Sequence, residues 1–200
     1  MTEKLDRRQL RTKQLLRQAL LSIVETKGFD GITVSELAQA AGINRGTFYL
    51  HYSDVPHMVE SIHSEMMNGL QAIMEEVDIN ELFTVPVTKE PYRVVVRVLE
   101  YMELHTDYFK VTLGPKGDTS ILLQLKKMLQ KQMYSKLTFL FPDAEMSPFP
   151  LDYLIAYASS ANIGIIQHWF ETGCKLRPKE VASLMLRILQ QGPRGSIGLS

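Results

Sequence analysis

The sequence predicts an all-α protein. Three observations lead to this fold class: apolar residues recur at helical spacing along most of the chain, glycine and proline separate these segments, and no stretch has the pattern of a strand. With 200 residues, of which 45% are hydrophobic and 22% charged, the chain is long enough to build a substantial core.

The first predicted helix covers about residues 8–27. A second, short helix follows Thr33, because Thr33-Val34-Ser35-Glu36 forms a capping box in which a hydroxyl and a carboxylate each satisfy a free backbone N–H group. Gly42 ends this helix, and Asn44 is a good N-cap for a third helix at about 45–50.

Further helices are predicted at about 54–77, 91–105, 107–113, 119–141, 151–172 and 178–191, separated by segments with proline or glycine. We therefore expect a three-helix N-terminal head, a connecting helix, a larger helical domain and a flexible tail, at 1–53, 54–77, 78–191 and 192–200 respectively.

Charge and cysteine content restrict the compartment and the partners. The net charge is zero, yet residues 1–17 hold six basic and two acidic residues, a local net of +4. Such a patch suits a polyanion, although it could also be a solvated helix face. The single cysteine, Cys174, excludes a disulfide framework and favours a reducing compartment, for which we expect the cytoplasm.

A membrane-bound protein is not expected. Residues 153–170 lack charge over a length that could span a bilayer, but their polar and small residues favour a buried helix. The charged segment 1–11 has no apolar core of a secretory signal.

Two short helices joined by a glycine turn, after a longer helix, predict a helix-turn-helix, whose second short helix enters the major groove of DNA. Arg45 and Thr47 would begin that recognition helix, where side chains reach base edges, and Gly46 would allow close approach of the DNA. The polar groups of Tyr49, His51 and Tyr52, and those of Thr33, suit phosphate oxygens. For His51 and Tyr52, local packing is the alternative.

The segment from Thr33 to Tyr52, TVSELAQAAGINRGTFYLHY, resembles the DNA-binding segment of the TetR/AcrR family of transcriptional regulators, and the likeness extends over about residues 11–60. The resemblance implies phosphate contacts from Thr33, Thr47, Tyr49 and His51, and base contacts from Arg45, with Asn44 and Thr47 as further candidates. One departure concerns the start of the next helix, where relatives have a phosphate-binding lysine and this chain has Val55. His57 or the basic N-terminus could make a phosphate contact in place of this lysine.

The resemblance also implies a C-terminal ligand-binding and dimerisation domain in which the last two helices pair across a two-fold axis. The helix at 151–172, uncharged over residues 153–170, agrees with a homodimer, because a helix without a charged side needs a partner surface. Candidates for lining a site for a small apolar ligand are Tyr101, His105, Tyr108, Phe109, Tyr157, Asn162, His168 and Trp169. For each of them, core or dimer packing is the alternative.

The sequence thus predicts a dimeric DNA-binding regulator, most simply a repressor that a small ligand releases from a palindromic operator. The alternative is a constitutive or architectural DNA-binding protein of the same fold without an inducer. No nucleophile elbow, phosphate loop, metal-ligand spacing or paired-carboxylate arrangement stands out, so we expect no enzyme, no metal site and no cofactor.

Overall fold

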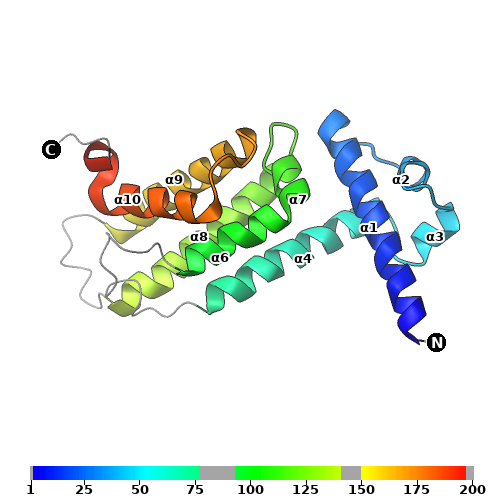
Figure 1. Ribbon diagram of the computed structural model, residues 1–200, viewed down its shortest axis with the longest axis horizontal. Coiled ribbons are helices and arrows are strands. Elements are labelled where there is room, and N and C mark those ends of the chain that lie inside the picture. The colour runs from blue at the N-terminus through cyan, green and yellow to red at the C-terminus, as the bar shows by residue number, and fades with distance from the viewer. Residues whose placement is uncertain (1, 77–92, 141–149, 197–200) are drawn as a thin grey trace. The chain divides into compact units, whose positions relative to one another are not determined.

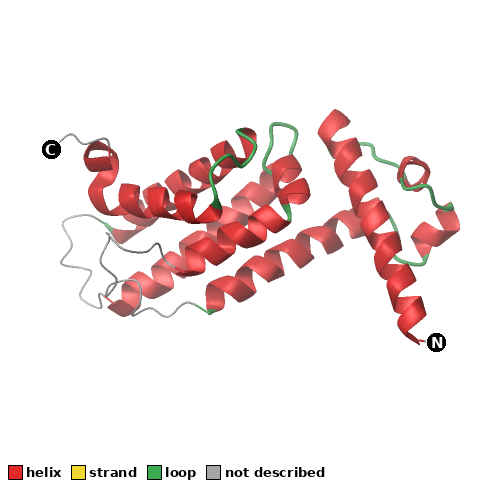
Figure 2. Cartoon of the chain, viewed as in Figure 1, coloured by secondary structure: helices red, strands yellow, loops and turns green. Residues whose placement is uncertain are grey.

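The computed structural model describes residues 2–76, 93–140 and 150–196, and all secondary structure in them is helical, as predicted (Figure 2). The helices, labelled in Figure 1, are α1 (Thr2–Lys27), α2 (Val34–Ala40), α3 (Arg45–Tyr49), α4 (Val55–Glu75), α6 (Arg93–Leu104), α7 (Thr106–Thr112), α8 (Thr119–Leu140), α9 (Leu151–Glu171) and α10 (Pro178–Ser196).

The two ends of the chain differ most from the prediction. Helix α1 begins at Thr2, about one and a half turns before the expected start. Helix α10 continues to Ser196, although Gly192 interrupts it with a φ of +66°, a conformation that glycine adopts without strain. The linker expected at 78–90 and the connector at 141–149 lie outside the described residues.

The chain divides into two compact units that do not follow the predicted domain boundaries. The first unit comprises residues 1–67 and 107–119, and the second comprises 68–106 and 120–200. Residues 107–119 had been predicted to belong to the larger domain. They lie in the first unit because Tyr108 and Phe109 are completely buried there.

The core of the first unit is built from one face of each long helix. Leu16, Leu20 and Val24 of α1 are buried, as are Met58, Ile62 and Met66 of α4, at a spacing of four residues that places each set on one side of its helix. Phe48 of α3 and Leu37 of α2 are also completely buried, so each short helix is fixed to this core by a large apolar side chain.

In the second unit, α10 packs on α6 and α9. Trp169 of α9 is buried, and its indole N–H donates to the carbonyl of Leu176, 2.8 Å away, so its polar atom is satisfied inside the protein. Gly69 near the end of α4 faces Tyr101 of α6, and a Cβ at this glycine would collide with the tyrosine hydroxyl. The glycine therefore allows the tyrosine ring to lie against the backbone of α4.

The uncharged segment 153–170 is part of α9. None of the described helices combines the length and hydropathy of a membrane span.

Candidate nucleic-acid interface

The turn between α2 and α3 is a Schellman motif, which fixes the direction in which the chain leaves α2. Gly42 has a φ of +64°, its N–H donates to the carbonyl of Gln39, and the N–H of Ile43 donates to the carbonyl of Ala38. A residue with a side chain is disfavoured in this backbone conformation. The glycine predicted to end α2 therefore sets the geometry of the helix-turn-helix.

Asn44 caps α3 as predicted. Its side-chain oxygen accepts a hydrogen bond from the N–H of Gly46 at 3.0 Å, while its backbone is extended. Because the oxygen is used by the cap, the amide NH2 group of this exposed residue is the part that can donate to a base. Phe48, completely buried on the opposite side, orients α3 on the core.

The outer surface of α3 carries Arg45 and Tyr49, both exposed, with Thr47 half-buried beside them. Gly46 lies within this surface. A Cβ at Gly46 would meet the Asn44 side-chain oxygen at 3.7 Å, an ordinary van der Waals contact, and the residue does not have a positive φ. Nothing in the described part of the chain therefore requires glycine at this position.

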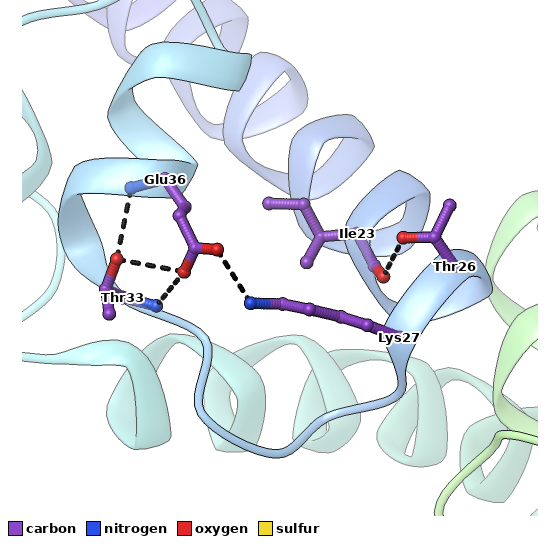
Figure 3. Close-up of polar contacts among 5 residues, drawn as sticks. All are labelled: Ile23, Thr26, Lys27, Thr33 and Glu36. Carbon is purple, nitrogen blue, oxygen red and sulfur yellow. Dashed lines mark hydrogen bonds and ion pairs between the residues drawn. The ribbon is translucent and has the colours of Figure 1, made fainter.

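Figure 3 shows the capping box at the start of α2, where Thr33 and Glu36 point toward each other. The Thr33 hydroxyl donates to the Glu36 carboxylate at 2.9 Å and accepts from the Glu36 N–H at 3.2 Å. Lys27, from the last turn of α1, donates to the same carboxylate at 2.7 Å. A phosphate contact from the Thr33 hydroxyl would therefore need this hydroxyl to exchange partners.

These contacts also set the charge of Glu36. The hydrogen bond from Lys27, followed by those from the backbone and hydroxyl of Thr33, lowers the pKa of Glu36 to about 2. The carboxylate is therefore ionised at neutral pH and links α1 to α2.

The aromatic residues after α3 differ in exposure. Tyr52 is buried, and its ring packs between those of Phe48 and His57 with centroid distances of 5.8 Å to each. Burial, and secondarily the charge of Glu65, raises the pKa of Tyr52. The structure thus places Tyr52 in the core rather than on the outer surface of α3.

His51 is half-buried beside the basic surface of α1. Burial, and secondarily the positive charge of Lys13, lowers the pKa of His51. Neutral His51 retains an N–H group with which it can donate to a phosphate. The exposed Lys13 is one of the basic residues of segment 1–17 that were expected to suit a polyanion. Its proximity to the end of α3 depends on tertiary packing, which the sequence does not show.

The start of α4 contains a second cap. Asp54 accepts from the N–H of His57 at 2.8 Å, and His57 Nδ1 accepts from the N–H of Ser53 at 3.1 Å. A ring that accepts at Nδ1 carries its proton on Nε2 when neutral. The exposed imidazole therefore has one N–H donor left, at the helix that begins with Val55 in place of lysine.

The residues expected to line a ligand site are divided between the two units. Tyr108 and Phe109 are buried in the first unit. Tyr101 and His105, in the second unit, are half-buried, and their ring planes are tilted by 60° with centroids 4.6 Å apart. Trp169 is buried, Asn162 is half-buried, and Tyr157 and His168 are exposed on α9.

Helix α9 has an uncharged exposed face. Every third or fourth residue along it is exposed or half-buried, namely Leu154, Tyr157, Ala161, Gly164 and His168. About half of the surface of two large members is accessible, 48% for Leu154 and 54% for Tyr157. One side of the helix is therefore uncovered within one chain. Its burial was predicted together with a partner surface, and that part stays a prediction.

Two family models match different parts of the chain. Residues 16–60 match the family model described as "Bacterial regulatory proteins, tetR family", and residues 89–191 match the model described as "Transcriptional regulator C-terminal region". A curated relative, the uncharacterized HTH-type transcriptional regulator YxbF of Bacillus subtilis (strain 168), is 21% identical over 177 residues. That match covers 88% of this chain but only 44% of the relative's length.

Two solved structures share the fold. A TetR transcriptional regulator from Streptococcus agalactiae 2603V superposes with a TM-score of 0.61 at 20% identity, covering 94% of this chain and 99% of the other. The transcriptional regulator FadR from Bacillus subtilis, crystallised in complex with stearoyl-CoA, gives a TM-score of 0.59 at 18% identity, covering 90% and 98%. Together with the helix-turn-helix geometry, the matches over both parts of the chain show that it belongs to the TetR family of transcriptional regulators.

Proposed function

We propose that this chain is a dimeric, sequence-specific DNA-binding repressor that leaves a palindromic operator when a small ligand binds. The observation that carries the proposal is the outer surface of α3. There the hydrogen-bond donors of Arg45 and Asn44 lie next to Gly46, a glycine that the fold of the protein does not require.

Arg45 would read bases. It is the first residue of α3, it is exposed, and its planar guanidinium can pair with O6 and N7 of one guanine. Thr47, Tyr49 and His51 would contact phosphates, which position the helix without reading sequence. The exposed basic residues of α1, Lys13 among them, would add electrostatic attraction.

The contact usually made by lysine at the start of α4 would be replaced in part by His57. Its Nε2–H is left unused by the cap, and its position is fixed by two hydrogen bonds. One N–H donor in place of a lysine ammonium group adds a hydrogen bond to phosphate without the permanent charge of lysine, so this substitution would lower the salt dependence of binding.

The uncovered face of α9 would form the centre of the dimer. Small residues at Ala161 and Gly164 would let two helices approach closely, with Leu154 and Tyr157 packed beside them. A dimer would place two copies of α3 on successive major grooves, about 34–36 Å apart in the simplest arrangement. Tyr157 and His168 would then belong to the dimer interface and not to a ligand site.

A small, mostly apolar ligand would bind among α6, α8 and α9. Two observations support this part of the proposal. Tyr101 of α6 and His105, the residue that follows α6, are half-buried with their ring centroids 4.6 Å apart, and a regulator of the same fold from Bacillus subtilis was crystallised with stearoyl-CoA. The ligand would act by population shift, favouring a dimer whose recognition helices no longer match the operator.

The test of DNA binding starts with duplexes that the protein selects from a randomised DNA pool. Palindromic sequences bound by one dimer, and much weaker binding to a shuffled duplex, are expected. Enrichment of no sequence above the starting pool would contradict the proposal. Light scattering on the free protein tests the dimer separately, and a monomer at the concentrations used for DNA binding would be evidence against it.

The test of induction uses two titrations of a candidate ligand, with and without the selected duplex. A hundredfold loss of DNA affinity corresponds to about 2.7 kcal/mol of coupling, and by reciprocity the duplex must weaken ligand binding by the same factor. Equal ligand affinities in the two titrations would leave a constitutive DNA-binding protein as the better description.

A further inference from the structure

A largely buried histidine of α4 contacts α7 and lies near the loop that follows it. His63 has a side chain only 13% exposed, and its ring lies 5.8 Å from that of Phe29 and 5.6 Å from that of Tyr108. Its Nδ1 is 2.6 Å from the Tyr108 hydroxyl oxygen. Its Nε2 is 3.9 Å from the Asp118 carboxylate and has no hydrogen-bond partner among the described residues.

The segment 107–118 has other polar contacts with α1, but these lie at the surface. Asp107 pairs with Arg17 at 3.1 Å, and Lys110 pairs with Glu25 at 3.3 Å. Exposed ion pairs of this kind contribute about 0–1 kcal/mol each. The contact between His63 and Tyr108 is partly buried, so a change that removes the acceptor of the Tyr108 hydroxyl proton has a larger effect.

The protonation state of His63 decides the direction of this hydrogen bond. In the neutral ring the proton is favoured on Nε2, which faces the Asp118 carboxylate, and Nδ1 then accepts from the Tyr108 hydroxyl. In the protonated ring both nitrogens carry a proton, so Nδ1 must donate and the hydroxyl proton must turn away. One proton thus reverses a buried contact.

The charges around the ring act in opposite directions. Asp118, from the loop after α7, favours a protonated ring, while Arg17, from α1, lies over the Tyr108 ring at 5.8 Å and adds positive charge nearby. Tyr108 is the titratable group that faces the ring from α7, and Phe29, before α2, is uncharged. Burial is the dominant influence and lowers the pKa of His63, with Asp118 opposing it. The packed arrangement therefore disfavours the proton.

We propose that His63 is a positioning residue for operator binding: its neutral ring holds residues 107–118 against α1 and α4, and protonation releases this segment and weakens operator binding. The inference rests on the proposed DNA-binding function. Helix α4 begins five residues after α3 ends, and its Met58, Ile62 and Met66 form one wall of the core of the first unit. A change in how α4 packs is therefore transmitted to α3.

The first experiment compares wild type with His63→Asn in the full chain, using a duplex selected by the wild type at about pH 8, where histidine is neutral. The asparagine side-chain oxygen can accept from Tyr108 at the place of Nδ1 and does not titrate. We expect equal affinities at about pH 8 and a wild type that binds about fivefold more weakly than the variant at about pH 5.5. His51 titrates in both proteins, so its effect cancels in the ratio.

An affinity ratio that does not change with pH would overturn the proposal. The second experiment measures amide hydrogen exchange in residues 107–118 of both proteins without DNA at about pH 5.5. Faster exchange in the wild type is expected, whereas equal exchange would show that protonation does not release the segment. His57→Asn, the same change at an exposed histidine of α4, is the control and should leave this exchange unaltered. Because the second experiment needs no DNA, it still tests His63 if no operator is found.

Discussion

Replacement of Gly46 by alanine should stabilise the fold but weaken operator binding, which tests whether the glycine serves the fold or the contact with DNA. The new Cβ would lie 3.7 Å from the Asn44 oxygen and meet no other atom within 4 Å, so the protein has room for it. The N–H that donates to Asn44 is retained. Because alanine is favoured over glycine in a helix, the free energy of unfolding should rise by about 0.5–1 kcal/mol.

Operator binding should change in the opposite direction. If a base or phosphate approaches Gly46 closely, one added methyl group must displace it, and overpacking of this kind costs about 1–3 kcal/mol. Such a cost corresponds to a loss of affinity of about 5- to 150-fold. Urea unfolding followed by circular dichroism measures the first quantity, and fluorescence anisotropy with the selected duplex measures the second.

Gly42→Ala is the matched control, because this glycine has a φ of +64°. Alanine in that conformation costs about 1–2 kcal/mol, so the same substitution four residues earlier should destabilise the protein. The reasoning about Gly46 is refuted if Gly46→Ala binds the operator with unchanged affinity, since close approach of the DNA would then not require glycine at this position.

Further substitutions test the other parts of the site. Arg45→Ala should weaken operator binding by about 1–3 kcal/mol and relax base preference at one position per half-site in a binding-site selection; an unchanged preference would exclude base reading. Val55→Lys should strengthen binding to any duplex and steepen its salt dependence by about 0.9 per phosphate neutralised, measured from 50 to 200 mM salt. Gly164→Glu on the uncovered face of α9 should give monomers in light scattering, and a persistent dimer would place the interface elsewhere. Glu36, whose pKa is lowered from 4.5 to about 2, should stabilise the fold above about pH 4.5 and lose this effect as the pH falls toward 2, so Glu36→Gln should flatten acid unfolding in that window.

The helix-turn-helix was predictable because local rules fix it. The capping box at Thr33, the turn at Gly42 and the cap at Asn44 each depend on residues within four or five positions of one another, and all three form as expected. The burial of Phe48 is the expected position of a large apolar side chain, whereas the exposure of Arg45 is read from the structure.

What the sequence could not supply depends on how side chains pack in three dimensions. Tyr52 has the polar hydroxyl of a phosphate-contacting residue, yet it is only 5% exposed and its ring packs beside those of Phe48 and His57. Tyr108 and Phe109 belong to a segment that follows the head by more than forty residues, and no local pattern predicts that this segment folds back onto α1. The expected ligand-lining residues had been chosen for their amphipathic side chains, which do not show whether a side chain faces inward or outward.

The discontinuous first unit affects how this protein could be recombined with its relatives. A chimera that exchanges residues 1–60 for the head of another regulator would leave Tyr108, Phe109 and Asp107 facing a surface to which they were not matched. The graft would combine well-formed recognition helices with a mismatched contact. Transplanting residues 107–119 together with the head would preserve the partners of Arg17, Glu25 and His63. For exchange of DNA specificity, the transferable module is therefore two stretches of sequence and not one.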